Sequence, residues 1–375
     1  MNIAINTRLL IENELEGIGR FSFEIIRRIV KKYPQINFHL IFDRKYSEKF
    51  LFEKNVTAHI IHPKTRHPII WYYWFEIQMP KLLKKINADL LVSLDGFLTT
   101  KINTPKINVV HDINFEHRPK DLPFFYRKYY RHYIPKYCNI SDKIITVSNF
   151  SKNDISEKYN VKKNKIHVVY NGVSNSFSTI NIDQKKELKN NYASGEEYFI
   201  FVGSLHKRKN IGRMLQAFDL FKTKTASKIK FIIIGKKRWW SSNMQKIYNN
   251  LIYKKDIRFT GYVEEKKLNI LISSAKCLCF VSLFEGFGLP IIEAMKCGTP
   301  VITSNTSSMP EICGKAGLIV NPKNIKEIAL AMEKINEDPK LCDDLIKHGI
   351  ERSKIFNWEK SADDFCEVLD QFIKK

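Results

Sequence analysis

The stretch Tyr198-Phe-Ile-Phe-Val-Gly203 decides the fold, because it begins a second series of short apolar runs in the middle of the chain. A β-branched and aromatic run that ends in glycine is typical of a buried parallel strand. Further runs of this kind follow at 229–234, 257–260, 277–282, 300–303 and 317–320. Amphipathic stretches such as 210–226 and 264–274 separate them. The second half therefore predicts alternating strands and helices.

The first half of the chain has the same alternation. Strands are expected at 2–6, 38–43, 57–61, 89–94, 107–111, 143–148 and 166–169, with helices between them, for example at 18–33 and 76–87. Residues 174–195 are polar with weak periodicity, so we expect the domain boundary there. The sequence predicts an α/β protein with two doubly wound, Rossmann-like domains, residues 1–174 and 175–357, and a final helix within 358–375.

The composition is that of a globular protein with an excess of positive charge. The 375 residues include 44% hydrophobic and 27% charged side chains, and the formal net charge is +23. Such a charge implies attraction to nucleic acid, a phospholipid surface or a phosphorylated substrate. No apolar run approaches the ~20 residues of a membrane span, and the N-terminus does not have the pattern of a signal peptide. We therefore expect a cytoplasmic protein.

The strongest motif is Glu285-Gly-Phe-Gly-Leu-Pro-Ile-Ile-Glu293, directly after the expected strand 277–282. Its glycines allow a close approach of the backbone to a ligand. Its proline suits the first turn of a helix, so the loop leads into a helix N-terminus, where free N–H groups favour phosphate. Glu285 in the loop and Glu293 in the first helical turn can accept hydrogen bonds from sugar or ribose hydroxyls. The alternative is a glycine turn with two surface acids.

Two further segments follow expected strands. Gly203-Ser-Leu-His-Lys-Arg-Lys-Asn210 places Arg208 and Lys209 near the end of a strand, where their charges suit a departing pyrophosphate. Val109-Val-His-Asp112 places His111 at the tip of another strand, where a histidine is structural or catalytic. Glu16-Gly-Ile-Gly-Arg20 opens a helix and matches only part of the dinucleotide-binding fingerprint.

Together these motifs resemble the retaining GT-B glycosyltransferases of family 4, the "glycosyl transferases group 1", which include mannosyl- and rhamnosyltransferases of bacterial surface polysaccharide assembly. The likeness covers nearly the whole chain. Besides the motifs above, it includes Asn6-Thr-Arg-Leu, Thr146-Val-Ser-Asn-Phe-Ser, Tyr170-Asn-Gly-Val, Ser307-Ser-Met-Pro-Glu and Gly317-Leu-Ile-Val-Asn-Pro. The resemblance implies a GT-B fold, with two domains that face each other across a cleft and a final helix that crosses back to the N-terminal domain.

The resemblance also implies roles for the matching positions in the second domain. Glu285 is similar to the residue that binds the hydroxyls of the donor sugar, and Glu293 to the ligand of the ribose. The backbone around the donor is provided by Gly286, Phe287, Gly288 and Leu289, and by Gly203 and Ser204. Many relatives have arginine where this chain has Ser204, so the resemblance leaves the pyrophosphate to Arg208 and Lys209.

In the first domain, His111 is similar to the residue near the reactive face of the donor sugar. Gly17 and Gly19 are similar to the loop that faces donor and acceptor. The implied reaction proceeds with retention: the acceptor hydroxyl attacks from the face that the nucleotide leaves, and the departing phosphate takes the proton.

We find no DxD motif where a metal-dependent transferase would have one, so we expect no metal and no cofactor. The resemblance to mannosyltransferases implies GDP-mannose as donor, with dTDP-rhamnose or a UDP-hexose as alternatives. The implied acceptor is a glycan hydroxyl, on a polyprenyl-diphosphate-linked oligosaccharide of O-antigen or lipopolysaccharide type.

Two aromatic segments of the first half have two interpretations. Ile69-Ile-Trp-Tyr-Tyr-Trp-Phe75 precedes an expected helix, and Phe124-Phe-Tyr-Arg-Lys-Tyr-Tyr-Arg-His-Tyr133 lies on one. The rings either form a core beneath a solvated basic face, or belong to a patch that contacts the anionic surface of the inner membrane.

Two other functions compete with sugar transfer. A nucleic-acid-binding protein would explain the charge, but it leaves the pair of glutamates without a role, so we expect no nucleic-acid partner. The other is a nucleotide-sugar epimerase of the same fold. Analysis of the products formed without an acceptor would separate an epimerase from a transferase.

Overall fold

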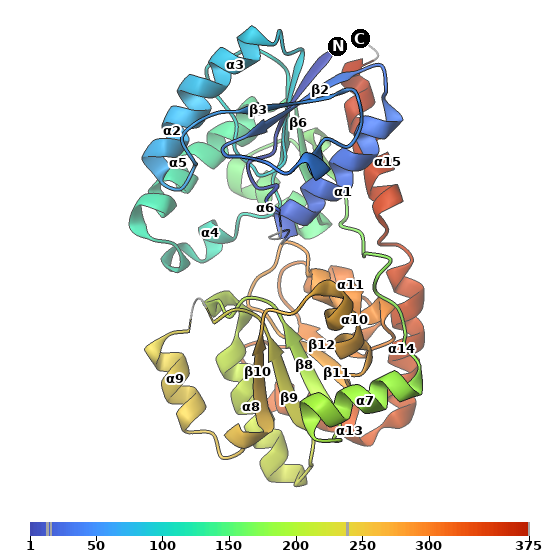
Figure 1. Cartoon of the computed structure of the whole chain (residues 1–375). Helices are drawn as coiled ribbons and strands as arrows, with labels where there is room; N and C mark the ends of the chain where they lie inside the picture. The colour runs from blue at the N-terminus through green and yellow to red at the C-terminus, as the bar shows by residue number, and fades with distance from the viewer. Residues whose placement is uncertain (13–14, 16, 238–239, 374–375) are drawn as a thin grey trace. The chain divides into compact units, whose positions relative to one another are not determined.

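The computed structural model in Figure 1 describes residues 1–12, 15, 17–237 and 240–373. The chain divides into two compact units. Unit 1 consists of Met1–Gly172 and Trp358–Lys375, and unit 2 of Val173–Asn357. Each unit has a parallel sheet with helices packed on it, as the alternation of strands and helices in the sequence predicts.

Within the described residues, unit 1 contains a seven-stranded parallel sheet in the order β3-β2-β1-β4-β5-β6-β7. Its strands are β1 (Asn2–Asn6), β2 (Asn37–Phe42), β3 (Val56–Ile60), β4 (Leu90–Ser93), β5 (Lys106–Val109), β6 (Lys143–Thr146) and β7 (Ile166–Val168). All of them confirm strands expected from the sequence. The strand order reverses between β1 and β4, which makes this the switch point of the sheet, where doubly wound proteins bind ligands.

The helices of unit 1 include the C-terminal segment of the chain. They are α1 (Gly17–Lys32), α2 (Pro68–Tyr73), α3 (Met79–Lys85), α4 (Asn114–His117), α5 (Phe124–Ile140), α6 (Asn149–Tyr159) and α15 (Trp358–Ile373). Helix α15 packs on α1: the ring of Trp358 lies edge-on to that of Phe21, with 6.2 Å between centroids. Tyr33 donates a hydrogen bond of 2.8 Å to Asp370.

The aromatic segment 69–75 does not precede a helix but forms one. The helical backbone begins at Pro68, with His67 as N-cap, and continues through a π-helical segment, Trp74–Gln78, into α3. The periodicity of the sequence predicted a helix only from residue 76, and the residues before it are aromatic and β-branched, which are poor helix formers. Packing overrides that preference, since Trp71, Trp74 and Phe75 are all buried.

Unit 2 has a six-stranded parallel sheet in its described residues, in the order β10-β9-β8-β11-β12-β13. Its strands are β8 (Tyr198–Val202), β9 (Lys230–Ile234), β10 (Ile257–Gly261), β11 (Cys277–Phe280), β12 (Val301–Ser304) and β13 (Gly317–Val320). The strand order reverses between β8 and β11. This second switch point therefore lies between the two strands that precede the strongest motifs.

The helices of unit 2 are α7 (Ile182–Ala193), α8 (Ile211–Thr225), α9 (Ser242–Asn249), α10 (Glu265–Ser273), α11 (Leu289–Lys296), α12 (Met309–Cys313), α13 (Ile325–Glu337) and α14 (Pro339–Ser353). Helix α7 lies within the polar segment 174–195, whose weak periodicity does not predict a helix. The side chain of Asn181 caps its N-terminus and Ser194 ends it in the left-handed conformation. Only Leu188 and Ala193 among its residues are buried, which explains the weak periodicity.

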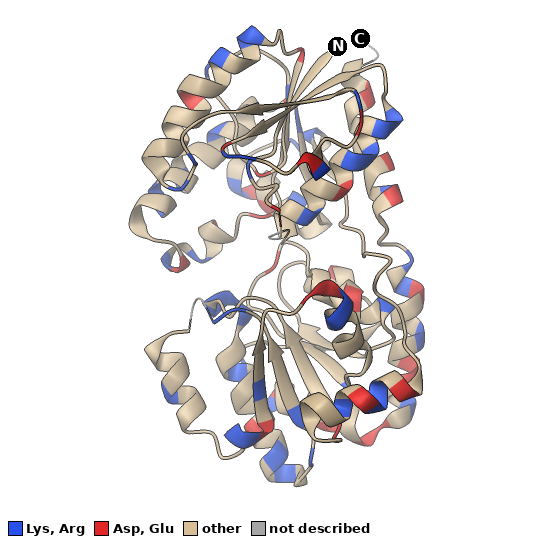
Figure 2. Ribbon diagram, viewed as in Figure 1, with Lys and Arg blue, Asp and Glu red and all other residues tan. Residues whose placement is uncertain are grey.

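Lys and Arg residues occur along the ribbon of both units (Figure 2), and the chain has 62 basic against 39 acidic residues. Among the helices in the described part of the chain, none combines the length and apolar character needed to span a membrane.

Candidate functional site

The loops that follow β8 and β11 meet at the switch point of unit 2. After β8 the chain forms a short 3-10 turn, Lys207–Lys209, which ends at Asn210 in the left-handed conformation. The buried amide of Asn210 donates hydrogen bonds to the carbonyls of Val281, at 3.0 Å, and Pro322, at 2.6 Å. The turn is thereby fixed to the segment that follows β11.

This arrangement brings three of the predicted site residues together. Nη1 of Arg208 lies 2.6 Å from Oε2 of Glu285, and Nζ of Lys209 lies 2.6 Å from Oε1 of the same carboxylate. Lys209 and Glu285 are 8% and 6% exposed, so both ends of that pair are buried. A buried carboxylate between two cations forms a preorganised charged group at the end of the strands.

The charges decide the protonation state of Glu285. Burial by itself raises the pKa of this carboxyl, but the positive charges of Arg208 and Lys209 outweigh it and lower the pKa to about 2. The carboxylate is therefore ionised throughout the physiological range and can only accept hydrogen bonds.

The glycine loop is held close to this cluster. Gly288 has a φ of +108°, and a Cβ there would lie 3.0 Å from the side chain of Ile291, so the position requires glycine. The hydroxyl oxygen of Ser308 lies 2.9 Å from the carbonyl oxygens of both Glu285 and Phe287, so its single proton is shared between them. The loop leads into α11, which begins at Leu289 with Pro290 in its first turn, as predicted.

One detail of that prediction is wrong. Because α11 begins at Leu289, Glu293 is its fifth residue and lies in the second turn, not in the first. Its side chain is half-buried.

The loop after β8 starts at a glycine with an unusual backbone conformation. Gly203 has a φ of +143°, which favours glycine, although a Cβ there would make only ordinary contacts, with Cε of Lys209 at 3.7 Å. The ammonium group of Lys209 also lies 4.7 Å from the centroid of the Phe280 ring. Ser204, half-buried, follows Gly203 in the loop.

The other predicted site residues belong to unit 1. Strand β5 ends at Val109, so His111 lies two residues beyond it and not within it. Nε2 of His111 lies 3.0 Å from the carbonyl oxygen of Leu94, which can only accept, so this nitrogen carries the proton. Burial lowers the pKa of His111, and the imidazole is therefore neutral at pH 7, with Nδ1 as an acceptor.

Gly17 is the first residue of α1, with a φ of +37°, and Gly19 is buried within the same helix. The opening of a helix at this motif is thus confirmed. Glu16, which begins the motif, lies outside the described residues.

Sequence reasoning missed a second buried ion pair, at the switch point of unit 1. Arg8 follows β1 and is 6% exposed, and its guanidinium pairs with Asp95, which follows β4. Asn6 donates a hydrogen bond of 2.8 Å to the same carboxylate, and the Arg8 guanidinium lies 4.3 Å from the centroid of the Phe97 ring. The signal in the sequence was a charged residue shortly after each of two apolar strands.

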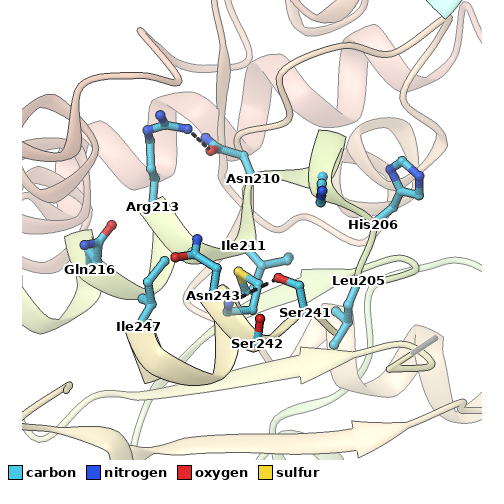
Figure 3. Close-up of a pocket in the computed structure, with 13 residues that line it drawn as sticks. Leu205, His206, Asn210, Ile211, Arg213, Gln216, Ser241, Ser242, Asn243 and Ile247 are labelled. Atoms are coloured by element: carbon cyan, nitrogen blue, oxygen red, sulfur yellow. Dashed lines mark hydrogen bonds between the residues drawn. The ribbon is translucent and has the colours of Figure 1, made fainter. Parts of the chain in front are cut away.

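A pocket of about 580 Å³ lies between α8 and α9 (Figure 3). Its lining includes Lys207, Asn210, Arg213 and Ser241, but neither Arg208 nor Lys209. Gly212 permits the close packing of the two helices, because a Cβ there would lie 3.1 Å from both Ile247 and Met244. The loop after β8 thus directs Lys207 to this pocket and the next two residues to Glu285.

Both units match models of known protein families. Residues 15–177 match "Glycosyltransferase Family 4", and residues 183–352 match "Glycosyl transferases group 1". Among curated proteins, the O-antigen chain mannosyltransferase B of Escherichia coli is 28% identical, over 93% of this chain and 94% of its own. The O-antigen chain mannosyltransferase RfbU of Salmonella typhimurium is 30% identical, over 76% of each chain.

The fold has counterparts among solved structures. Anabaena Alr3699/HepE, crystallised with UDP and glucose, superposes with a TM-score of 0.77 at 15% identity, over 99% of this chain and all of the other. The two parallel sheets and this likeness identify the GT-B fold. With the family matches along both units and the curated relatives, they show that the chain is a glycosyltransferase of family 4, the glycosyl transferases group 1.

Proposed function

We propose that this glycosyltransferase moves mannose from GDP-mannose to a glycan hydroxyl, with retention of anomeric configuration and without a metal ion. The acceptor in this proposal is a polyprenyl-diphosphate-linked oligosaccharide of O-antigen or lipopolysaccharide type, reached from the cytoplasmic face of the inner membrane. Two curated relatives named as O-antigen chain mannosyltransferases support the sugar and the pathway. The observation that carries the proposal is the meeting of Arg208 and Lys209 with Glu285 at the switch point of unit 2.

In the proposed reaction, the acceptor oxygen forms a bond to C1 of the sugar while the bond from C1 to the phosphate oxygen breaks. Negative charge then grows on the leaving diphosphate, where Arg208 and Lys209 stabilise it. The same phosphate takes the proton of the acceptor hydroxyl. Glu285, ionised at neutral pH, accepts hydrogen bonds from hydroxyls of the donor sugar, and Glu293 from those of the ribose.

The remaining assignments rest on the family resemblance. In the proposal, neutral His111 contacts the donor sugar, and Gly17 and Gly19 border donor and acceptor. The backbone of Gly286–Leu289 and of Gly203–Ser204 surrounds the diphosphate. Retention is supported by the family resemblance alone, and the proposed reaction uses no pair of carboxylates of the kind found in glycosidases.

The donor is tested by thermal unfolding of the protein with GDP, UDP and dTDP and with their sugar conjugates. A ligand at 100 times its dissociation constant stabilises the folded state by about 2.7 kcal/mol. We expect the guanine nucleotides to raise the Tm of the wild type. Lys209→Ala should lose this shift, measured against its own Tm without ligand, because the cation that faces the diphosphate is gone.

Lys207→Ala is the matched control, since Lys207 lies in the same turn but is exposed and lines the pocket instead. It should keep the shift. A response to UDP or dTDP alone would replace GDP-mannose with one of the other donors. If no nucleotide shifts the Tm of the wild type, the donor-site assignment is wrong.

Stereochemistry and metal use are tested with the donor so identified. We expect proton NMR of the product to show the same anomeric configuration as the donor, and the rate to be unchanged in excess EDTA. An inverted product, or a rate that EDTA abolishes and Mg²⁺ or Mn²⁺ restores, would contradict the proposal. Conversion of the donor sugar without an acceptor would indicate an epimerase.

A further inference from the structure

The two aromatic segments of unit 1 lie side by side in the structure. Tyr126 of α5 packs edge-on against Trp71 of α2, with 5.2 Å between ring centroids, and its hydroxyl donates a 2.7 Å hydrogen bond to the carbonyl of Arg66. The ring of His67, the N-cap of α2, lies 6.4 Å from that of Phe125. The first turns of α2 and α5 thus form one surface, on the same side of the sheet (Figure 1).

Some large apolar side chains of these segments are buried and others are exposed. Trp71, Trp74, Phe75, Tyr129 and Tyr137 belong to the core of unit 1. Ile69, Phe124 and Phe125 are 73%, 60% and 65% exposed. Packing in the core explains why the first group is aromatic. The second leaves large apolar side chains in water at the point where the helices begin, and we call these three residues the apolar tip.

The two segments that carry the apolar tip are strongly basic. Residues 62–85 and 119–136 contain ten basic and two acidic side chains, a balance of +8 out of the +23 of the whole chain. Of the two acids, Glu76 is buried and Asp121 pairs with Arg118. Lys64, Arg66 and Lys128 are exposed and lie close in sequence to the tip.

We propose that the apolar tip and its basic surroundings dock unit 1 on the surface of an anionic phospholipid bilayer. Exposed apolar side chains enter the boundary between headgroups and acyl chains, while Lys and Arg side chains attract the anionic headgroups. The docking rests on the proposed function, in which the acceptor is linked to a membrane lipid. Binding of unit 1 to the bilayer itself requires neither donor nor acceptor, so it can be tested separately.

The test is co-sedimentation of the full chain with vesicles of phosphatidylglycerol and phosphatidylcholine, or of phosphatidylcholine alone. We expect binding to the anionic vesicles only, weakened by salt. Phe124→Ser/Phe125→Ser should lower the partition coefficient by about tenfold or more, because two of the three inserting side chains are lost. Lys64→Gln/Arg66→Gln/Lys128→Gln should lower it by a similar or larger factor.

Ile182→Ser/Ile252→Ser is the matched control, because these side chains of unit 2 are 79% and 72% exposed and lie outside the docking surface. It should bind vesicles as the wild type does. The nucleotide-induced rise in Tm should persist in every variant, which separates a failure of docking from a failure of the donor site.

Several results would overturn the inference. They are no binding of the wild type to anionic vesicles at low salt, equal binding to neutral vesicles, or equal loss in the control variant. A concentration-dependent dimer that Phe124→Ser/Phe125→Ser dissociates would assign the tip to self-association instead. Binding of single-stranded oligonucleotide that the same variant abolishes would assign it to nucleic acid.

Discussion

Glu285→Gln is expected to lower the kcat/KM of sugar transfer by about 10²–10³-fold, the usual effect of losing one preorganised polar group at a reacting centre. The amide has the shape of the carboxylate but not its charge, so it is a weaker acceptor for the sugar hydroxyls. Arg208 and Lys209 remain and no longer share an internal anion. We therefore expect nucleoside diphosphate to bind at least as tightly as before, while transfer falls.

Lys209→Ala is compared with Glu285→Gln in the same assays. We expect Lys209→Ala to weaken nucleotide binding, which Glu285→Gln should leave intact. Isothermal titration with the diphosphate, together with initial rates of transfer, measures both quantities. If Glu285→Gln bound nucleotide poorly and transferred sugar at the normal rate once saturated, the roles assigned to the two residues would have to be exchanged.

Glu285→Gln should also destabilise the protein, because removal of one partner of a buried ion pair costs about 3–5 kcal/mol. The pKa of Glu285 is about 2 in the folded protein, below the ordinary 4.5, so its contribution is fully present above pH 4.5. It is lost as the pH falls through 4.5 toward 2, where the unfolded chain binds the proton first. The difference in unfolding free energy between wild type and Glu285→Gln should therefore be constant above about pH 5 and shrink below it.

Gly235→Ala is expected to destabilise unit 2 strongly, because the added methyl group overlaps backbone atoms. A Cβ at Gly235 would lie 1.9 Å from the carbonyl oxygen of Gly203 and 2.7 Å from its carbonyl carbon. Both are backbone atoms, so no rotamer change can relieve the overlap. We expect a loss of about 3 kcal/mol or more in unfolding free energy, beyond the usual range of overpacking. Displacement of Gly203 should also move Lys209 and weaken nucleotide binding.

Gly261→Ala is the control for the backbone conformation. Gly261 also has a positive φ, +74°, but a Cβ there would meet no atom within 4 Å, so only the conformational cost of about 1–2 kcal/mol remains. Chemical denaturation of the two variants measures the difference. If the two variants had equal free energies of unfolding, the ends of β8 and β9 would move apart easily. Gly235 would then not fix the position of the loop after β8.

The sequence by itself determined the strands, because a buried parallel strand is a local run of apolar residues that ends abruptly. The run Tyr198–Val202 and the other runs expected from the pattern are strands in the structure. It also determined which loops carry the charged residues of the site. The helices were less certain: α7 buries too little to show a period, and the run of aromatic residues in α2 is held in a helix by packing.

Only the tertiary structure decided which charges meet. Arg208 and Glu285 are separated by 77 residues, and their ion pair exists because β8 and β11 are neighbours at the switch point of the sheet. Arg8 and Asp95, 87 residues apart, meet for the same reason between β1 and β4. Strand order is set by the packing of whole elements, which leaves no local trace in the sequence.

The apolar tip shows the same limit. The sequence marked residues 69–75 and 124–133 as aromatic and basic, but it could not separate core rings from exposed ones. Trp71 and Phe125 are both aromatic residues in aromatic segments, yet Trp71 is 5% exposed and Phe125 is 65% exposed. The difference arises because Trp71 packs against Phe97 and against tyrosines of α5, while Phe125 lies in the exposed first turn of α5.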